Sequence, residues 1–404
     1  MPSGGRASVC GMPAPRKSVE PIGDKTGLVL AGGGARGAYE AGALAELLPN
    51  LDRKHFPKVV VGTSVGALQA AYFGANAQLG PERVMEAAID LWDTVEPGEV
   101  IRPLRSGIVR ALRYGLSLAR IHEEAVFQVL DPAPLRNTLE ERVDFEQLHA
   151  NVGSEVDTVA VVATAAATSR SVVFLEGKGR KRHDNRRGID YFPTRLQLDH
   201  VIASAAIPLA FPAVAIPEGF TPPGTTWYFD GGTRLNTAIK PVLTLGADRV
   251  IVIALNSVPQ KQEHTRPAEG QPAAAEAAMQ LVQALLVDPL VQDVQTLASR
   301  NAARRGDVVP YILVSPEPYA IGRLADAAYE RFSRRPLSDI AVLGRLTGKS
   351  EGPAHGEILS YLFFSHEFTN GLVELGRADA RRWLTEHADE PEPYWRREPL
   401  DWMV

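Results

Sequence analysis

Apolar residues in the first 260 positions gather in short β-branched runs, each followed by a longer stretch rich in alanine and leucine. Two such units lie close together, with predicted strands at 26–32 and 58–63 and predicted helices at 35–48 and 65–75. The same pattern predicts further strands at 158–164, 171–175, 226–229 and 249–255. Strands that alternate with helices favour a mainly parallel sheet covered by helices, so we expect an α/β fold.

The rest of the chain has fewer strand-like runs and longer helical patterns. Apolar spacing predicts helices over 275–300 and 355–387, with one additional strand at 308–314. We therefore divide the chain into three parts. They are a disordered N-terminal segment at 1–25, a core domain at 26–258, and a mainly helical C-terminal extension at 259–404 that packs on the core domain.

Composition excludes some classes of protein. The 404 residues carry a net charge of -5, so no general attraction to nucleic acid is expected. The first 26 residues lack the continuous apolar region of a signal peptide, and the longest apolar stretch, 201–216, is too short and contains prolines. The single cysteine, Cys10, fits a reducing compartment. We expect a cytoplasmic protein without a transmembrane helix, able to bind a membrane surface peripherally.

A sequence typical of a nucleophile elbow lies at residues 62–66, Gly-Thr-Ser-Val-Gly. In this motif Gly62 and Gly66 permit a sharp turn from a strand into a helix, and the turn exposes the serine hydroxyl. A predicted strand precedes the motif and a predicted helix follows it. Ser64 is therefore the candidate nucleophile.

A glycine-rich turn follows the first predicted strand and reads Gly-Gly-Gly-Ala-Arg-Gly at residues 32–37. Backbone amides without side chains can approach a developing negative oxygen closely, and a helix that begins just after them assists. We predict an oxyanion hole made from the amides of Gly32, Gly33, Gly34 and Val65. Gly37 belongs to the same turn.

The same glycines also satisfy a dinucleotide-binding pattern, which is an alternative interpretation. That pattern requires an acidic residue at the end of the second strand, whereas this strand ends in Thr63-Ser64. The oxyanion interpretation is therefore favoured. Arg36, within the turn, has three open interpretations: it orients the loop, attracts an anionic head group, or is an ordinary surface residue.

A serine nucleophile needs a base, and the sequence offers two candidates. Asp230 ends a predicted strand and is followed by Gly231 and Gly232, which places a carboxylate on a tight turn. Burial would raise its pKa and make it a better base. His200 is the best histidine candidate, although a capping or core-edge position is the more common one for such a residue. No cluster of residues has metal-ligand spacing, so neither metal nor cofactor is expected.

Four sequence blocks, in this order and spacing, resemble the patatin-like phospholipase family over about 27–258. They are residues 32–37, 62–66, Ala-Ser-Ala-Ala-Ile-Pro-Leu-Ala-Phe-Pro at 203–212, and Asp-Gly-Gly at 230–232. The resemblance implies a three-layer α/β/α fold and a Ser–Asp dyad, with Ser64 as nucleophile, Asp230 as base and residues 32–37 as the oxyanion loop. It further implies that the 203–212 block lines the acyl pocket and positions the strand that presents Asp230.

One departure follows the aspartate, where similar proteins often have Asn-x-Pro and this chain has Asn236-Thr237-Ala238. We expect the loop to differ in shape there while the dyad is retained.

The leading hypothesis is a carboxylic ester hydrolase of the phospholipase A or lysophospholipase type, acting on phospholipids or glycerolipids through an acyl-serine. One alternative is a lipid acyltransferase that uses the same acyl-serine with an alcohol acceptor. A second alternative is a non-catalytic lipid-binding protein that keeps a relic elbow.

Two basic segments suggest reversible contact with an anionic membrane. Residues 101–121 contain five arginines and no acidic residue, in an amphipathic helical pattern that includes Arg110, Arg113 and Arg120. A packed helix with a solvated arginine face is the alternative. Residues 178–187 predict an exposed, flexible basic loop that includes Lys178, Arg180, Lys181 and Arg182. We expect both segments to lie around the mouth of the site.

Overall fold

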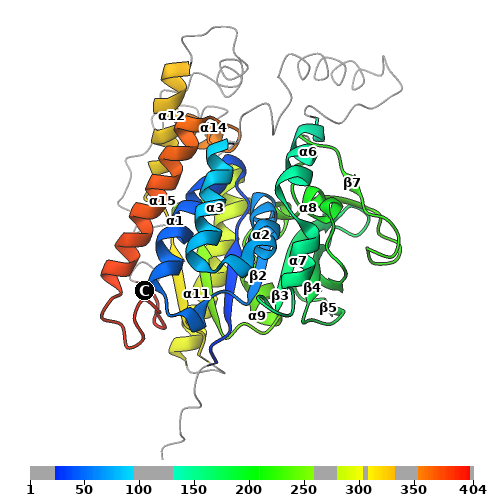
Figure 1. Cartoon of the computed structure of the whole chain (residues 1–404), viewed down its shortest axis with the longest axis horizontal. Helices are drawn as coiled ribbons and strands as arrows, with labels where there is room; N and C mark the ends of the chain where they lie inside the picture. Colours follow the sequence, from blue (N-terminus) through cyan, green and yellow to red (C-terminus); the bar gives the residue numbers. More distant parts are fainter. Residues whose placement is uncertain are drawn as a thin grey trace, which may run out of the picture.

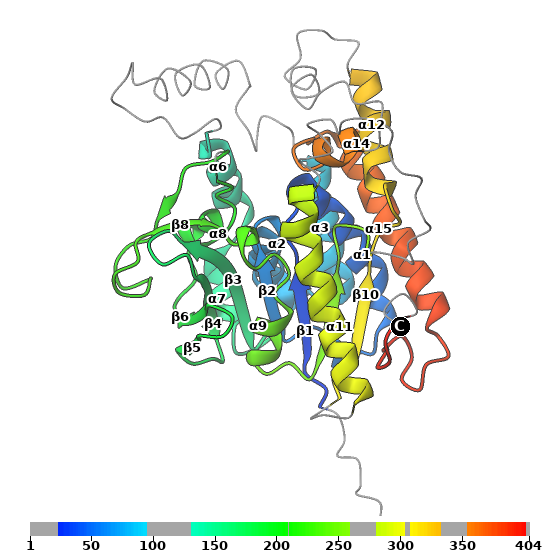
Figure 2. The same cartoon turned by 180° about the vertical axis from the view of Figure 1, so that it is seen from behind.

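A single mixed sheet with helices on both faces forms the centre of the protein (Figures 1 and 2). The computed structural model describes residues 23–94, 131–208, 210–258, 280–303, 308–332 and 354–400. Within these residues the strand order is β10-β9-β1-β2-β3-β4-β6-β5, with β8 paired to β3 and β7 paired to β8. The expected α/β fold with a mainly parallel sheet is confirmed.

The strands are short, and five of the described strands are buried along their whole length. Their bounds are β1 Thr26–Leu30, β2 Val59–Thr63, β3 Thr158–Ala165, β4 Ser171–Gly177, β5 Arg182–Asp184, β6 Ile189–Pro193, β7 Val214–Ala215, β8 Trp227–Asp230, β9 Arg249–Ile253 and β10 Tyr311–Val314. All residues of β1, β2, β3, β9 and β10 are buried, as continuous apolar runs in a covered parallel sheet require.

Five neighbouring strands run in the same direction and therefore end at the same edge of the sheet. β1 pairs in parallel with β2 and β9, β2 with β3, and β9 with β10. We call this edge the carboxyl edge. β8 runs antiparallel to β3, with Asp230 opposite Ala163. The last residues of β2 and β8 are consequently brought close to each other.

Helices cover both faces of this sheet. The described helices are α1 Gly37–Leu47, α2 Val65–Asn76, α3 Pro81–Thr94, α6 Ala133–Arg142, α7 Phe145–Asn151, α8 Leu198–Ser204, α9 Ile239–Thr244, α11 Asp288–Ala302, α12 Ala320–Phe332, α14 Ala354–Leu359 and α15 His366–Glu386. α1, α2, α3 and α7 lie over the face seen in Figure 1, and α9 and α11 over the face seen in Figure 2.

The C-terminal part of the chain is joined closely to the core of the sheet. β10 pairs with β9 at the end of the sheet, and α15 packs along α1. The helix predicted over 355–387 is interrupted, because α14 ends at Leu359 and Ser365 caps the start of α15 with a hydrogen bond from the Phe368 amide. Residues 360–364 form a turn between these two helices, and the Tyr361 oxygen there accepts a hydrogen bond from the Ala35 amide.

Some predicted features lie partly or wholly outside the described residues. They are the disordered segment at 1–25 before residue 23, the basic segment at 101–121, and the start of the helix at 275–300. No helix of the described part of the chain has the length and hydrophobicity needed to cross a membrane.

Candidate active site

Ser64 occupies a strained turn between β2 and α2. Its φ is 55° and its ψ is -124°, which is unusual for a residue with a side chain. The turn depends on its flanking glycines, since a Cβ atom at Gly62 would lie 2.0 Å from the Gly66 oxygen. At Gly66 a Cβ atom would lie 2.2 Å from the Leu30 oxygen. The predicted elbow geometry is thus present, and it directs the Ser64 hydroxyl away from the strand.

The structure brings Ser64 and Asp230 together, although 166 positions separate them in the sequence. The Ser64 hydroxyl donates a hydrogen bond of 2.6 Å to Asp230 Oδ2. The other carboxylate oxygen, Oδ1, accepts a 2.6 Å hydrogen bond from the Gly232 amide. One oxygen of Asp230 is therefore fixed by the backbone, and the other faces the candidate nucleophile.

Burial alters the acidity of Asp230. Loss of solvation raises the pKa of this carboxyl from 3.8 to about 6, against the opposing effects of the Ser64 hydroxyl and the Gly232 amide. The carboxylate is still mainly ionised at neutral pH, and it is a stronger base than an exposed aspartate. A proton that it accepts during a reaction can also be returned readily.

Ser204, at the end of α8, holds the elbow in place. Its Oγ accepts a 2.9 Å hydrogen bond from the Ser64 amide and donates one to the Val162 oxygen of β3. Nearby, the Ala206 oxygen accepts a hydrogen bond from the Asp230 amide. The block at 203–212 thus positions the strand that presents Asp230, as expected. Sequence reasoning did not identify the individual role of Ser204, and its place inside that block was the available signal.

The glycine loop after β1 is held on several sides. Asn236 bridges Gly32, because its Oδ1 accepts from the Gly32 amide and its Nδ2 donates to the Gly32 oxygen, both at 3.1 Å. The prediction that the Gly32 amide serves an oxyanion is therefore wrong, since that amide is already engaged. The amides of Gly33, Gly34 and Val65 have no hydrogen-bond acceptor among the described residues.

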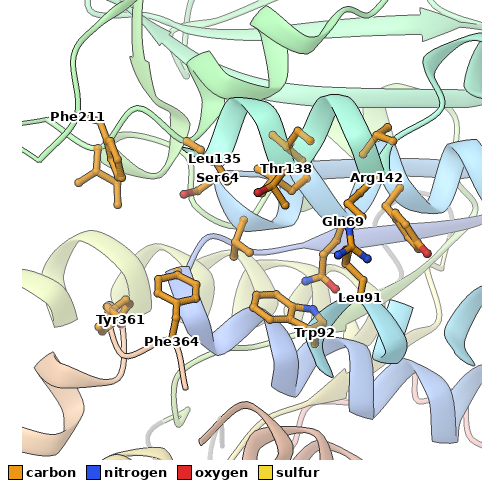
Figure 3. Close-up of a pocket in the computed structure, with 18 of the residues that line it drawn as sticks. Ser64, Gln69, Leu91, Trp92, Leu135, Thr138, Arg142, Phe211, Tyr361 and Phe364 are labelled. Atoms are coloured by element: carbon orange, nitrogen blue, oxygen red, sulfur yellow. The ribbon is translucent and has the colours of Figure 1, made fainter. Parts of the chain in front are cut away.

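An apolar cavity of about 100 Å³ opens beside Ser64 (Figure 3). Ser64, Gly34 and Val65 all lie on its wall. Figure 3 shows Leu135 of α6 and Phe211 on one side of Ser64, and Trp92 of α3 and Phe364 on the other. Ala205, Ile207 and Phe211, all from the 203–212 block, line it as expected. The cavity suits an unbranched hydrocarbon chain next to the hydroxyl.

Comparison with known families agrees with this geometry. A sequence model described as patatin-like phospholipase matches residues 28–243, just over half of the chain. The chain belongs to the patatin-like phospholipase family. Among solved structures, it is similar to the crystal structure of VipD from Legionella pneumophila, with 13% identity and a TM-score of 0.31. That alignment covers 88% of this chain and 67% of VipD. No curated protein matches the chain.

His200 does not act as the base in this patatin-like chain. The histidine is fully buried; its Nδ1 accepts a hydrogen bond from the Gln197 amide, and its Nε2 lies 2.9 Å from the Phe220 oxygen. Both ring nitrogens are therefore engaged by the backbone, and the Nδ1 contact is part of the capping box at the start of α8. The capping position expected as the more common one is confirmed.

Arg36 of the patatin-like glycine loop is buried, with 1% of its surface exposed. Its guanidinium forms an ion pair of 2.6 Å with Glu357, close to the C-terminus. The interpretations as a surface residue and as a ligand for an anionic head group are therefore wrong. The remaining interpretation, that Arg36 orients the loop, agrees with this burial.

The basic segment at 178–187 lies elsewhere than expected. Gly177 pairs with Thr158 at the start of β3, whereas Ser64 follows the end of the parallel strand β2, so Lys178 lies at the opposite end of the sheet. Lys178 forms a 2.7 Å ion pair with Asp157 there. Residues 182–184 also form β5 instead of a flexible loop, although Arg180, Lys181 and Arg182 are exposed. The expectation that this segment borders the site is wrong for Lys178.

Within the described ranges, no group of three or more His, Cys, Asp or Glu side chains could hold a metal ion.

Proposed function

We propose that the protein is a serine lipid acyl hydrolase that cleaves carboxylic esters of phospholipids or glycerolipids. The observation that carries this proposal is the 2.6 Å hydrogen bond between Ser64 and a buried Asp230 at the wall of an apolar cavity. A polar pair beside an apolar cavity fits an ester whose acyl chain is buried and whose carbonyl faces the hydroxyl. Membership of the family supports lipid esters as the class of substrate.

The geometry suggests a two-step reaction. Ser64 Oγ attacks the ester carbonyl as its proton moves to Asp230 Oδ2, and the amides of Gly33, Gly34 and Val65 stabilise the oxyanion. Collapse of the tetrahedral intermediate breaks the bond to the alcohol, which takes the proton from Asp230. A water molecule then attacks the acyl-serine as its proton moves to Asp230. Collapse of the second tetrahedral intermediate breaks the bond to Ser64 Oγ, which takes that proton from Asp230, and the fatty acid is released. In this scheme Asp230 accepts and returns every proton, and the loop amides only stabilise the oxyanion.

Removal of the nucleophile tests the proposal directly. The Ser64→Ala variant should be folded and should release no fatty acid above background, since an alanine cannot form the acyl-enzyme. The measurement is mass spectrometry of lipid products after incubation with phosphatidylcholine and phosphatidylglycerol vesicles. Labelling by a fluorophosphonate should occur in the wild type and disappear in Ser64→Ala. A wild-type protein that neither labels nor hydrolyses would favour the non-catalytic lipid-binding alternative.

The fate of the acyl-serine separates hydrolysis from acyl transfer. We propose water as the acceptor, and the same product analysis with added lysophospholipid measures how much acyl group moves to an alcohol instead. Fatty acid as the major product supports hydrolysis. A diacyl product that dominates at low acceptor concentration would identify an acyltransferase.

The pH dependence should report the ionisation of Asp230. Since burial raises its pKa to about 6, kcat/KM should fall about tenfold per pH unit below that value and level off above it. The test is a pH–rate profile on a neutral ester at two temperatures. A carboxyl group ionises with a small enthalpy and an imidazole with a large one, so the apparent pKa should barely change with temperature. A strong temperature dependence would point to a histidine.

Contact with a lipid surface is a further part of the proposal. A substrate in a bilayer must reach the cavity beside Ser64, which is lined in part by α6. In the sequence, α6 comes soon after residues 95–130, which lie outside the described residues and include Arg110, Arg113 and Arg120. We propose that this basic segment makes the reversible contact with anionic lipid.

A further inference from the structure

A short segment near the C-terminus contacts the glycine loop through backbone atoms. This segment, residues 354–364, comprises α14 and the turn after it. The Tyr361 oxygen accepts a 3.1 Å hydrogen bond from the Ala35 amide. The same oxygen lies so close to Gly34 that a Cβ atom there would be 2.0 Å from it. The loop that carries the free amides of Gly33 and Gly34 therefore rests directly on residues from the far end of the sequence.

Arg36 joins the same two parts of the chain through side-chain contacts. Its Nη2 donates to the Glu357 carboxylate at 2.6 Å and to the Glu357 oxygen at 2.7 Å, and its Nε donates to Ser360 Oγ at 2.8 Å. Its Nη1 donates to the Leu255 oxygen and to Asn256 Oδ1, after the end of β9. All five N–H groups of the guanidinium are thus satisfied, which is the condition for keeping a buried arginine in one orientation.

The segment also forms part of the cavity wall. Tyr361, Leu362 and Phe364 line the cavity beside Ser64, and the guanidinium of Arg36 lies 4.0 Å from the centre of the Tyr361 ring. Every one of these C-terminal residues lies outside residues 28–243, the part that the family model matches. The contacts are therefore supplied by a part of this chain that the family model does not cover.

We propose that residues 354–364 are a positioning element of the active site, which holds the amides of Gly33 and Gly34 in place through Glu357, Ser360 and Arg36. This proposal rests on the proposed hydrolase function. Oxyanion donors act only when they are fixed before the reaction, and a displacement of about 1 Å can cost about 10²-fold in rate. Loosening the segment should therefore lower kcat, with a smaller effect on KM.

The chain contains a matched control for this contact. Arg249 forms an ion pair with Glu392, and its guanidinium lies 4.9 Å from the centre of the Trp395 ring. The side chains of Arg249 and Arg36 are similarly buried, at 2% and 1% exposure. Arg249 is the first residue of β9 and lies at the edge of the sheet opposite to Ser64. Asn256, which accepts a hydrogen bond from Arg36, follows the end of β9 and lies at the other edge. The control pair therefore anchors the C-terminal region without touching the site.

The experiment compares Glu357→Gln with Glu392→Gln in the full-length protein. Each variant removes the closest carboxylate partner of one buried arginine, and Arg249 keeps a second ion pair of 3.3 Å with Asp24. Both variants should therefore lower Tm, Glu392→Gln by the smaller amount. We expect kcat on a soluble p-nitrophenyl ester to fall by about tenfold or more in Glu357→Gln and by less than about twofold in Glu392→Gln. The rate of fluorophosphonate labelling of Ser64 should fall in parallel. Equal kcat values in the two variants would contradict the positioning role.

A milder substitution keeps the test decisive if Glu357→Gln does not fold. Ser360→Ala removes the acceptor of Arg36 Nε and retains the ion pair, so Tm should fall by less than in Glu357→Gln while kcat falls about threefold or more. Wild-type kcat in Ser360→Ala would overturn the proposal. The wild-type enzyme in the same assay separates a failure of the positioning role from a failure of the hydrolase function, because only the latter is contradicted by an inactive wild type.

Discussion

The Asp230→Asn variant is expected to be folded and almost inactive. Asparagine preserves the shape of the side chain, and its oxygen can still accept from the Gly232 amide while its NH₂ group donates to the Ser64 hydroxyl. It cannot take the proton of Ser64, so turnover should fall by about 10²–10⁴-fold, the usual contribution of a general base. Initial rates of fatty-acid release at pH 8 measure the effect, and activity within tenfold of wild type would exclude Asp230 as the base.

The same variant should also be more stable than the wild type at pH 8. Because the folded-state pKa of Asp230 is raised from 3.8 to about 6, its contribution to stability is favourable below pH 3.8 and is lost as pH rises through 6. An ionised Asp230 then costs about 3 kcal/mol relative to its neutral form. Replacement by a neutral amide removes this cost, so the gain in Tm should shrink as the pH is lowered from 8 towards 4.

Asp190→Asn is the control of opposite sign. Hydrogen bonds from Arg170 lower the pKa of Asp190, so its ionised form stabilises the folded state above the pKa of the unfolded chain and that stability is lost on acidification. Asp190 lies on β6, away from Ser64. This variant should lose stability at pH 8 and keep wild-type turnover. A stability gain in both variants would indicate a general charge effect instead of strain at the dyad.

Local sequence patterns predicted the parts of the site that depend on strand ends. The elbow around Ser64 requires a strand, a glycine on each side and a helix, all within a few residues, and each of these features can be recognised in the sequence. Asp230 was recognisable as a carboxylate on a turn after a strand. Its distance from Ser64 depends on β8 pairing with β3, which no local pattern encodes, and the resemblance to a family supplied that relation.

Contacts between distant segments account for what the sequence did not predict. Asn236 engages the Gly32 amide across 204 positions, and Glu357 meets Arg36 across 321. Hydrophobic periodicity identifies the buried face of an element but not the element that covers it. For the same reason the sequence correctly predicted that the segment at 178–187 is exposed, but it did not predict at which end of the sheet Lys178 lies.

The interruption near residue 360 shows how a continuous apolar pattern can hide a functional break. Helical spacing continues across 355–387, yet the backbone leaves the helix after Leu359. The Tyr361 oxygen accepts from Ala35 there, so a hydrogen bond to the glycine loop replaces one within a helix. Tertiary contact therefore overrides local helix propensity at a point on the wall of the cavity beside Ser64.

A methyl group at Gly34 should damage catalysis as well as stability. Gly34 has a φ of 59°, and a Cβ atom would lie 2.0 Å from the Tyr361 oxygen, so Gly34→Ala must displace the glycine loop or the segment at 354–364. Its amide is one of the proposed oxyanion donors. Loss of one such donor costs about 10²–10³-fold in kcat, and we expect a decrease of that size.

Gly80→Ala separates the catalytic effect from backbone strain. Gly80 has a φ of 82°, has open space where a Cβ atom would be, and lies beyond the far end of α2 from Ser64. Its ψ is 171°, a combination with positive φ that is used almost only by glycine, so an alanine there should cost about 1–3 kcal/mol of stability and leave turnover unchanged. Both variants should lower Tm, Gly34→Ala by more because of its clash with the Tyr361 backbone, but only Gly34→Ala should lower kcat. If Gly34→Ala retained wild-type kcat, the glycine loop would not be the oxyanion hole, and the oxyanion would need other hydrogen-bond donors.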